Sequence, residues 1–326
     1  NSFLFDTEFI YKASRRKEIN LRTINANIKE GLAVSDMGFK VLRREALNFL
    51  SILFHRDSLT FLILPSFDIE AFDAPSEHAV ELPFEEQMRT SVEGTRKILA
   101  CLARHRVKAT FFCTANFALH AKDLILDIQK GGHEIASHGF YHSSFETADL
   151  RKSKEALEEL TGQPVNGFRM ARMMPVEEEE IHKAGYLYNS SLNPTCIPGR
   201  YNHLGQPRTY FMKDGVLQLP ASVTPIVRFP LFWLAYHNLP ASLYRKLALW
   251  TWKEDGYFLT YFHPWEFTSL SDRKELKLPF IMTNHSGCGM ERRLDALIRF
   301  FKDKRAPFGT YTQFSQEILS KSHGQE

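Results

Sequence analysis

The stretch LTFLILPSF, residues 59–67, is a nearly continuous apolar run that predicts a buried β-strand. A helix is predicted to follow over about residues 84–104, and residues 108–114 (KATFFCT) predict the next strand. Strands that alternate with helices in this way are typical of a parallel sheet or barrel. The predicted fold class is therefore α/β.

The alternation continues along the chain to residue 191 and then breaks into a long polar, turn-rich segment. Further helices are predicted over about 119–130, 148–160, 176–184 and 292–304, and strands before His138, at 167–170, at 186–191 (strand or turn) and at 256–262. The aromatic segment 226–236 (IVRFPLFWLAY) is too short to span a bilayer. It fits core packing, and alternatively a groove wall or lid that touches sugar or lipid.

Two histidines stand four residues apart in GGHEIASHGFYHSS, residues 131–144. On a turn or nascent helix, this spacing puts His138 and His142 on one side. Two imidazoles placed in this way make half of a divalent-metal site. An isolated HxxxH pair more often combines a core histidine with a helix cap. Here carboxylates, an arginine and a third histidine follow other predicted strands, and they favour the metal interpretation.

Acidic residues follow the first predicted strand. Asp68 and Glu70 are two residues apart, so on a regular strand they face the same way. One of them can bind a metal while the other takes a proton from a metal-bound water. Two solvated acids are the alternative.

Arg169 and His263 also follow predicted strands. The planar guanidinium of Arg169 suits holding a carboxylate in one orientation, and a surface arginine is the alternative. His263 lies between aromatic residues and has the side-chain type that protonates a leaving amine at neutral pH; a core histidine is the alternative. Functional groups of parallel α/β folds gather at the carboxyl ends of the strands, so we expect these side chains to converge.

The composition is that of an ordinary soluble globular protein, with 44% hydrophobic and 24% charged residues among 326. A formal net charge of +3 is small for this length and argues against bulk nucleic-acid binding. The four cysteines form no CxxC motif and are expected to be reduced core residues, with one near the surface. No secretory signal or apolar run of bilayer length is recognisable, and the first residue is Asn1, so we expect an excised piece of a longer chain.

Residues 1–56 differ from the rest and predict a helix, a strand at 19–28 and a basic amphipathic helix at about 39–54. This second helix can pack on a neighbouring domain or lie on a membrane surface. FLFDTEF and the elements after it resemble the C-terminal end of family 2 glycosyltransferases of the type that loads sugars onto polyprenyl phosphate. The resemblance implies that Asp6 and Glu8 derive from an acidic pair near that active site. The nucleotide-sugar fold is absent, so no sugar transfer is expected of this piece.

The segment from about Leu59 to Phe314 resembles the polysaccharide deacetylases, carbohydrate esterase family 4. The resemblance is closest to the branch with a DxE-type first motif and an HPWE-type last motif, here SFDIE and LTYFHPWEF. It implies an irregular (β/α) barrel over residues 57–326, with residues 1–56 as a small helical appendage. It also implies removal of N- or O-acyl groups from sugars with a divalent metal, usually zinc.

The resemblance also implies roles for individual residues. Asp68 corresponds to the catalytic base and Arg169 to the residue that orients it, while His263 corresponds to the general acid. Glu70, His138 and His142 correspond to the metal ligands, with Asp73 as the reserve for Glu70, because Ile69 stands where many members have a second aspartate.

Two motifs depart from the family pattern. MARM follows GFR where the family usually has proline and an aromatic residue. YNSS places Asn189 where the family has an aspartate that tunes the catalytic histidine. These departures keep open a catalytically weak, carbohydrate-binding pseudo-enzyme of the same fold. The intact acid and histidine set favours an enzyme, in which a backbone N–H near Arg172 helps to hold the oxyanion.

The two resemblances together lead us to expect an N-acylated sugar polymer, an oligosaccharide or a lipid-linked sugar as the substrate. The lack of a recognisable signal and the basic helix predict a cytoplasmic protein at the inner face of the membrane. The oligomeric state, the sugar and the acyl group are not indicated by the residues.

Overall fold

The computed structural model of the chain describes residues 61–323. The predictions for residues 1–56, including the glycosyltransferase-like segment with Asp6 and Glu8, lie outside the described residues. Among the helices described, none combines the length and the apolar character needed to cross a membrane.

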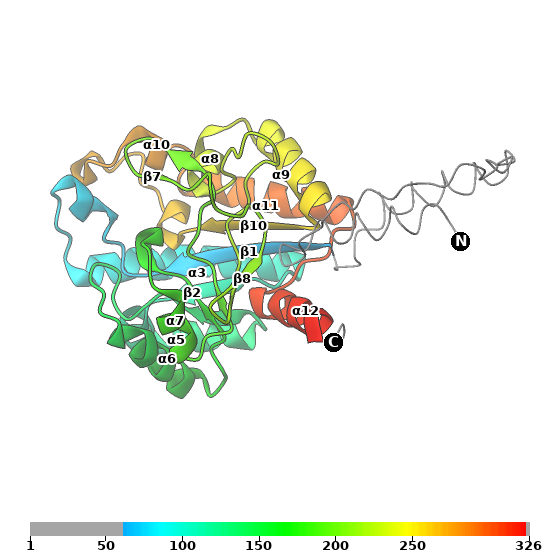
Figure 1. Cartoon of the computed structure of the whole chain (residues 1–326). Coiled ribbons are helices and arrows are strands. Elements are labelled where there is room, and N and C mark those ends of the chain that lie inside the picture. The colour runs from blue at the N-terminus through cyan, green and yellow to red at the C-terminus, as the bar shows by residue number, and fades with distance from the viewer. Residues whose placement is uncertain (1–60, 324–326) are drawn as a thin grey trace, which may run out of the picture. The chain divides into compact units, whose positions relative to one another are not determined.

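A curled eight-stranded sheet forms the centre of the described fold (Figure 1). Its strands run in the order β10-β1-β2-β3-β4-β5-β9-β8, and every neighbouring pair is parallel except β8 with β9. The strands are β1 (Leu62–Ile69), β2 (Thr110–Cys113), β3 (Glu134–Ser137), β4 (Gly167–Phe168), β5 (Tyr188–Asn189), β8 (Phe211–Lys213), β9 (Val216–Gln218) and β10 (Tyr257–Phe262). The predicted α/β fold class is confirmed, and the curled sheet has a barrel-like arrangement.

Helices connect the parallel strands and cover the sheet (Figure 1). They are α3 (Phe84–His105), α4 (Ala115–His120), α5 (Lys122–Lys130), α6 (Ala148–Thr161), α7 (Glu178–Lys183), α8 (Trp233–Asn238), α9 (Ala241–Asp255), α10 (Phe280–Thr283), α11 (Cys288–Asp303) and α12 (Tyr311–His323). Helix α6 ends as predicted at Gly162, whose φ of 64° is a left-handed conformation that glycine adopts without strain.

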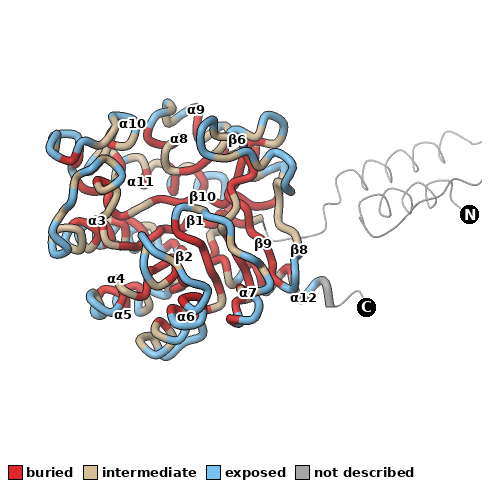
Figure 2. Tube along the Cα trace, turned by 60° about the vertical axis from the view of Figure 1, so that its left-hand side comes forward, coloured by how far each residue is buried: buried red, intermediate tan, exposed pale blue. Residues whose placement is uncertain are grey.

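The core lies between the sheet and these helices. All eight residues of β1 and all six of β10 are buried, so these strands have apolar neighbours on both faces (Figure 2). This explains why their sequences are continuous apolar runs rather than alternating patterns. Of the four free cysteines, Cys101 and Cys113 are buried, whereas Cys196 and Cys288 are exposed, which is one more at the surface than expected.

The structure differs from the predicted helices in two places. The helix predicted at 119–130 is two helices, because Ala121 has a non-helical ψ of 42° and separates α4 from α5. Helix α9 was not predicted at all. Its sequence ASLYRKLALWTWKED spreads apolar side chains around the helix, so the sequence shows no clear apolar stripe.

A short 3-10 helix, η3 (Pro264–Phe267), follows β10 and packs against α3. The contact is so close that a Cβ atom added to Gly94 of α3 would lie 1.8 Å from the carbonyl oxygen of Pro264. Gly94 is therefore required for the approach of the two backbones, although glycine costs helix stability. The segment that carries His263 is held in place by this packing.

We predict that Gly94→Ala destabilises the fold by about 1–3 kcal/mol, because backbone atoms rather than a flexible side chain must move. Thermal unfolding of the purified protein measures the effect as a lower melting temperature. Gly205→Ala is the matched control, since a Cβ atom there meets nothing within 4 Å and the backbone φ is not in the left-handed range. Equal melting temperatures for the two variants would contradict this account of Gly94.

Candidate active site and metal centre

The carboxyl ends of the parallel strands bring the predicted residues to one cleft of about 410 Å³. Asp68 is the second-last residue of β1, and Glu70 directly follows this strand. His138 follows β3, and His263 follows β10. His142 lies on the loop after β3. These five residues line the cleft, and Arg169, which follows β4, lies fully buried behind Asp68. The structure therefore brings all six predicted site residues together.

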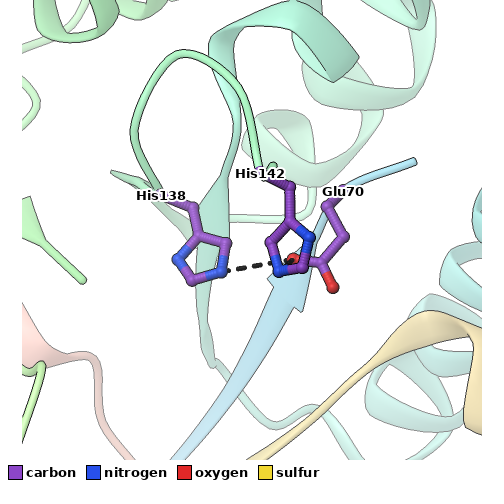
Figure 3. A group of neighbouring side chains, drawn as sticks. All are labelled: Glu70, His138 and His142. Atoms are coloured by element: carbon purple, nitrogen blue, oxygen red, sulfur yellow. Dashed lines mark ion pairs between the residues drawn. The ribbon is translucent and has the colours of Figure 1, made fainter. Parts of the chain in front are cut away.

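Glu70, His138 and His142 point toward one another (Figure 3). Their facing ligand atoms all lie within 4.8 Å of one another. Glu70 Oε2 is 3.2 Å from His138 Nε2 and 3.4 Å from His142 Nε2. This is the donor set, two imidazoles and one carboxylate, that catalytic zinc sites use while leaving positions open for water or substrate.

The hydrogen bonds that His138 and His142 make through Nδ1 leave Nε2 of each ring facing Glu70. His138 Nδ1 lies 2.8 Å from the carbonyl oxygen of Arg169, and an acceptor there requires Nδ1–H. His142 Nδ1 lies 2.8 Å from Asp73 Oδ2. With its proton on Nδ1, a neutral imidazole at either position would present its Nε2 lone pair to a metal in the cluster, and such outer partners orient metal-binding histidines. Asp73, the reserve ligand, supports His142 from behind and does not belong to the three-ligand group.

Two further observations fit a divalent cation. Glu70 Oε2 is buried and has no hydrogen-bond partner among the described residues, although a buried carboxylate oxygen normally has one. Burial alone would lower the pKa of His142, but Glu70 and Asp73 raise it to about 9. The cluster therefore favours a positive charge at this point. The residues present fit a divalent metal.

Asp68 and Arg169 form a buried ion pair beside the cluster. Arg169 Nη1 donates to Asp68 Oδ1 at 2.6 Å. Burial on its own would raise the pKa of Asp68, but the charges of Arg169, His138 and His263 outweigh it and hold the pKa below its ordinary value. Asp68 is therefore ionised at neutral pH and can accept a proton.

His263 faces the same cleft from the other side. Its Nδ1 lies 2.9 Å from Glu266 Oε1, in the helix η3 that begins directly after it. Burial alone would lower the pKa of His263, but the hydrogen bond and charge of Glu266 raise it above the ordinary value, with smaller contributions from Glu70 and Asp68. These neighbours favour the imidazolium form of His263 over that of a free imidazole, and this form can donate a proton.

The expectation that Asn189 occupies the tuning position beside His263 is corrected. Asn189 Nδ2 donates to Gln218 Oε1 at 3.0 Å, and its Oδ1 accepts from Ser191. The carboxylate that contacts His263 comes instead from Glu266, three residues further along the chain. Sequence reasoning quoted HPWEF without assigning the glutamate, although an acid three residues after a histidine in a helical turn is within reach of it.

The aromatic segment 226–236 contributes to both the core and the cleft. Leu231 and Tyr236 are buried in the core, whereas Trp233 lines the cleft beside His263 at a ring-centroid distance of 5.3 Å. Leu234, with Ile281 and Met282 of α10, adds further apolar side chains to the lining of this cleft. Ile226 and Val227 are exposed, at 79% and 74%. The segment therefore contributes both to the core and to the wall of the cleft, and contact with sugar or lipid stays a prediction.

Comparisons with known proteins relate part of the chain to one family. Residues 73–173 match the family model described as polysaccharide deacetylase. The chain is 34% identical over 96 residues to an uncharacterised 30.6 kDa protein of Geobacillus stearothermophilus, covering 27% of this chain and 36% of that protein. It is 30% identical over 95 residues to the peptidoglycan-N-acetylmuramic acid deacetylase PdaA of Bacillus subtilis, covering 28% and 35%.

Among solved structures, a protein of Mycobacterium smegmatis provisionally assigned as a polysaccharide deacetylase has a TM-score of 0.56 at 19% identity. That likeness covers 82% of this chain and 92% of the other and concerns the fold. The chain spans about a third of the length of the two curated relatives named above. The family-model match and the fold together support a polysaccharide deacetylase domain. The matched range includes His138, His142 and Arg169 and ends before His263.

We predict that Glu70→Gln and His142→Ala abolish stoichiometric zinc binding, and that Asp73→Asn weakens it by about 10–100-fold, as loss of an outer-sphere partner does. Isothermal titration with zinc after chelator treatment measures both effects. His120→Ala is the control, because His120 is exposed and bonds only the carbonyl of Asn116 in its own helix. Unchanged zinc affinity in Glu70→Gln would remove this cluster as the metal site.

Proposed function

We propose that this chain is a divalent-metal-dependent hydrolase that removes an N-acyl group, such as acetyl, from an amino sugar. One observation carries the proposal: the Glu70–His138–His142 cluster opens into the same cleft as Asp68, whose pKa is lowered by its neighbours, and His263, whose pKa is raised. Metal-assisted hydrolysis of an amide uses a metal site, a proton acceptor and a proton donor together. The catalytic residues proposed are Asp68, His263 and Arg169, and the proposed metal ligands are Glu70, His138 and His142.

The cluster would hold the metal, and we propose zinc because two imidazoles and one carboxylate are a donor set of catalytic zinc sites. When bound, a divalent metal polarises the acyl carbonyl and makes water a better nucleophile at neutral pH. Asp68 accepts the proton of the attacking water as the new carbon–oxygen bond forms. His263 gives its Nε2 proton to the sugar nitrogen as the carbon–nitrogen bond breaks, so the products are a carboxylate and a free amine.

The remaining residues hold these groups in place. Arg169 fixes the orientation of Asp68 through a charge-assisted hydrogen bond and keeps it ionised. Arg172 lines the cleft and has a left-handed φ of 57°, which is uncommon for a non-glycine residue. We assign to its backbone N–H the stabilisation of the oxyanion. Trp233 offers an aromatic face on which a sugar ring can stack.

The pseudo-enzyme alternative drew its support from the altered motif MARM after GFR and from Asn189, which removes the expected carboxylate partner of the general acid. Glu266 supplies such a carboxylate at 2.9 Å from His263 Nδ1. Asn189 therefore no longer favours a carbohydrate-binding scaffold over an enzyme, while the MARM departure still does. The catalytic proposal stands on the charged groups that line the cleft.

We further propose an N-acylated sugar on a polyprenyl carrier, or a short oligosaccharide precursor, as the substrate. The apolar wall of Trp233, Leu234, Ile281 and Met282 supports an apolar substrate portion next to the sugar. Phe280, 73% exposed on the same helix α10, extends this character to the surface. The proposed place at the inner membrane face rests on the resemblance of residues 1–56 and on the basic helix at 39–54, which lie outside the described residues.

We predict that Asp68→Asn keeps zinc but lowers kcat by about two to four orders of magnitude, because the amide cannot accept the water proton. The assay is acetate release, paired with zinc analysis and circular dichroism, since Arg169 loses its buried counter-charge in this variant. Asp127→Asn is the control, an identical change on an exposed acid. Near wild-type turnover with zinc intact would remove Asp68 from the mechanism.

We predict that initial rates are highest on a polyprenyl-linked N-acetyl sugar, lower on soluble chito-oligomers and lowest on peptidoglycan. Ile281→Ser should lower the rate on the lipid-linked sugar more than the rate on chito-oligomers, because only the first substrate has an apolar part to contact this wall. A strong preference for peptidoglycan, with no turnover of the lipid-linked sugar, would contradict the proposed substrate while leaving the deacylase chemistry intact.

A further inference from the structure

A chain of three titratable side chains extends from His263 in the cleft to Glu266 and His237, which are buried in the core. His263 Nδ1 and its backbone N–H both face Glu266 Oε1. The other carboxylate oxygen, Oε2, lies 2.9 Å from His237 Nε2. His237 Nδ1 in turn contacts the backbone carbonyl of Asn284. Glu266 and His237 are both 0% exposed, so no water competes for these contacts.

The partners of His237 define how many protons the chain holds. A backbone carbonyl is only an acceptor, so His237 Nδ1 must carry a proton. The contact between His237 Nε2 and Glu266 Oε2 is then a hydrogen bond only if one of these two atoms carries a proton. Either His237 is an imidazolium beside a carboxylate, or it is neutral and accepts from a protonated Glu266. In both placements the pair is neutral as a unit.

We propose that His237 acts, through Glu266, as a positioning residue for the proton that His263 gives to the leaving amine. The proposal rests on the function proposed above, and it assigns a role to a residue that never touches the cleft. A buried carboxylate with no other partner would hold the proton of His263 more tightly. Sharing the carboxylate with His237 weakens that hold, which leaves the proton easier to transfer to the substrate.

Both proton placements predict the same direction of change in the pKa of His263 when His237 is replaced. If His237 is an imidazolium, removing its charge removes a repulsion on His263. If Glu266 is protonated, removing its acceptor leaves a full carboxylate beside His263. Replacing His237 by a neutral donor therefore raises the pKa of His263, whereas neutralising Glu266 lowers it. Besides these two residues, Asp68 and Glu70 are the charged groups that face His263, and both variants leave them in place.

The test is an NMR titration of the His263 ring in the full chain, in the chelator-treated and zinc-loaded forms. Glu266→Gln should shift the His263 midpoint downward by about one pH unit or more, and His237→Gln should shift it upward. Glutamine suits the second variant because its amide nitrogen can still donate to Glu266 Oε2. The matched control is His105→Gln, which breaks a histidine–carboxylate contact of 2.7 Å with Asp295 on the far helices α3 and α11.

The control should leave the His263 midpoint unchanged. An unchanged His263 midpoint in His237→Gln, in a variant that is folded, would overturn the proposal. Because the readout is a ring titration, it stands even if the chain proves inactive on every amino sugar, so failure of the proposed function is distinguishable. Where activity is found, the basic limb of the kcat profile should move in the same directions, with KM changed little.

The wild-type protein offers a second measurement if His237→Gln fails to fold. Long-range proton–nitrogen correlation spectra report which ring nitrogens carry protons. The proposal expects a protonated Nδ1 on His237 across the range in which His263 titrates. A neutral His237 with its proton on Nε2 and none on Nδ1 would overturn the proposal, because His237 would then be a simple donor to a full carboxylate.

Discussion

The buried ion pair between Arg169 and Asp68 is the contact on which the site depends. A guanidinium without solvent exposure is stable only if its donors are satisfied and its charge is balanced. Nε donates to Ser190 O, Nη1 to Asp68 and Ser66, and Nη2 to Ser190 Oγ and Tyr311. The ring of Phe112 lies 4.0 Å from the guanidinium carbon. One side chain thus joins β1, β2, the segment after β5 and helix α12.

The charges around this pair alternate in sign. The positive Arg169 keeps Asp68 anionic, and Asp68 in turn favours the imidazolium of His263. Glu266 supports His263 from the far side, while Glu70 and Asp73 make a place for positive charge beside His142. Neighbours of opposite sign favour the charged forms of Asp68 and His263 that their proposed roles require, in surroundings where burial alone would favour the neutral forms.

Local sequence patterns predicted the strands and the residues after them well, because burial on both faces gives long apolar runs and the active groups follow directly. Asp68, His138 and His263 could be placed at strand ends for this reason. Glu266 and His237 could not be assigned, because their importance comes from a contact between segments 29 residues apart. Helix α9 was missed because its apolar residues form no stripe. The position of Asn189 was misjudged because a motif gives a residue's place in the chain, not the direction of its side chain.

The first strand of the sheet, β1, pairs with β10, the last strand in the chain, and Tyr311 from the final helix completes the partners of Arg169. During synthesis on a ribosome the amino-terminal part emerges first, yet β1 has no partner on this edge until residue 262 has been made. The deacetylase-like domain can thus mature only as a unit, after translation of its last helix. A nascent chain stalled before that point has an exposed apolar strand and a buried-type arginine without its full set of partners, which makes it a natural client for chaperones.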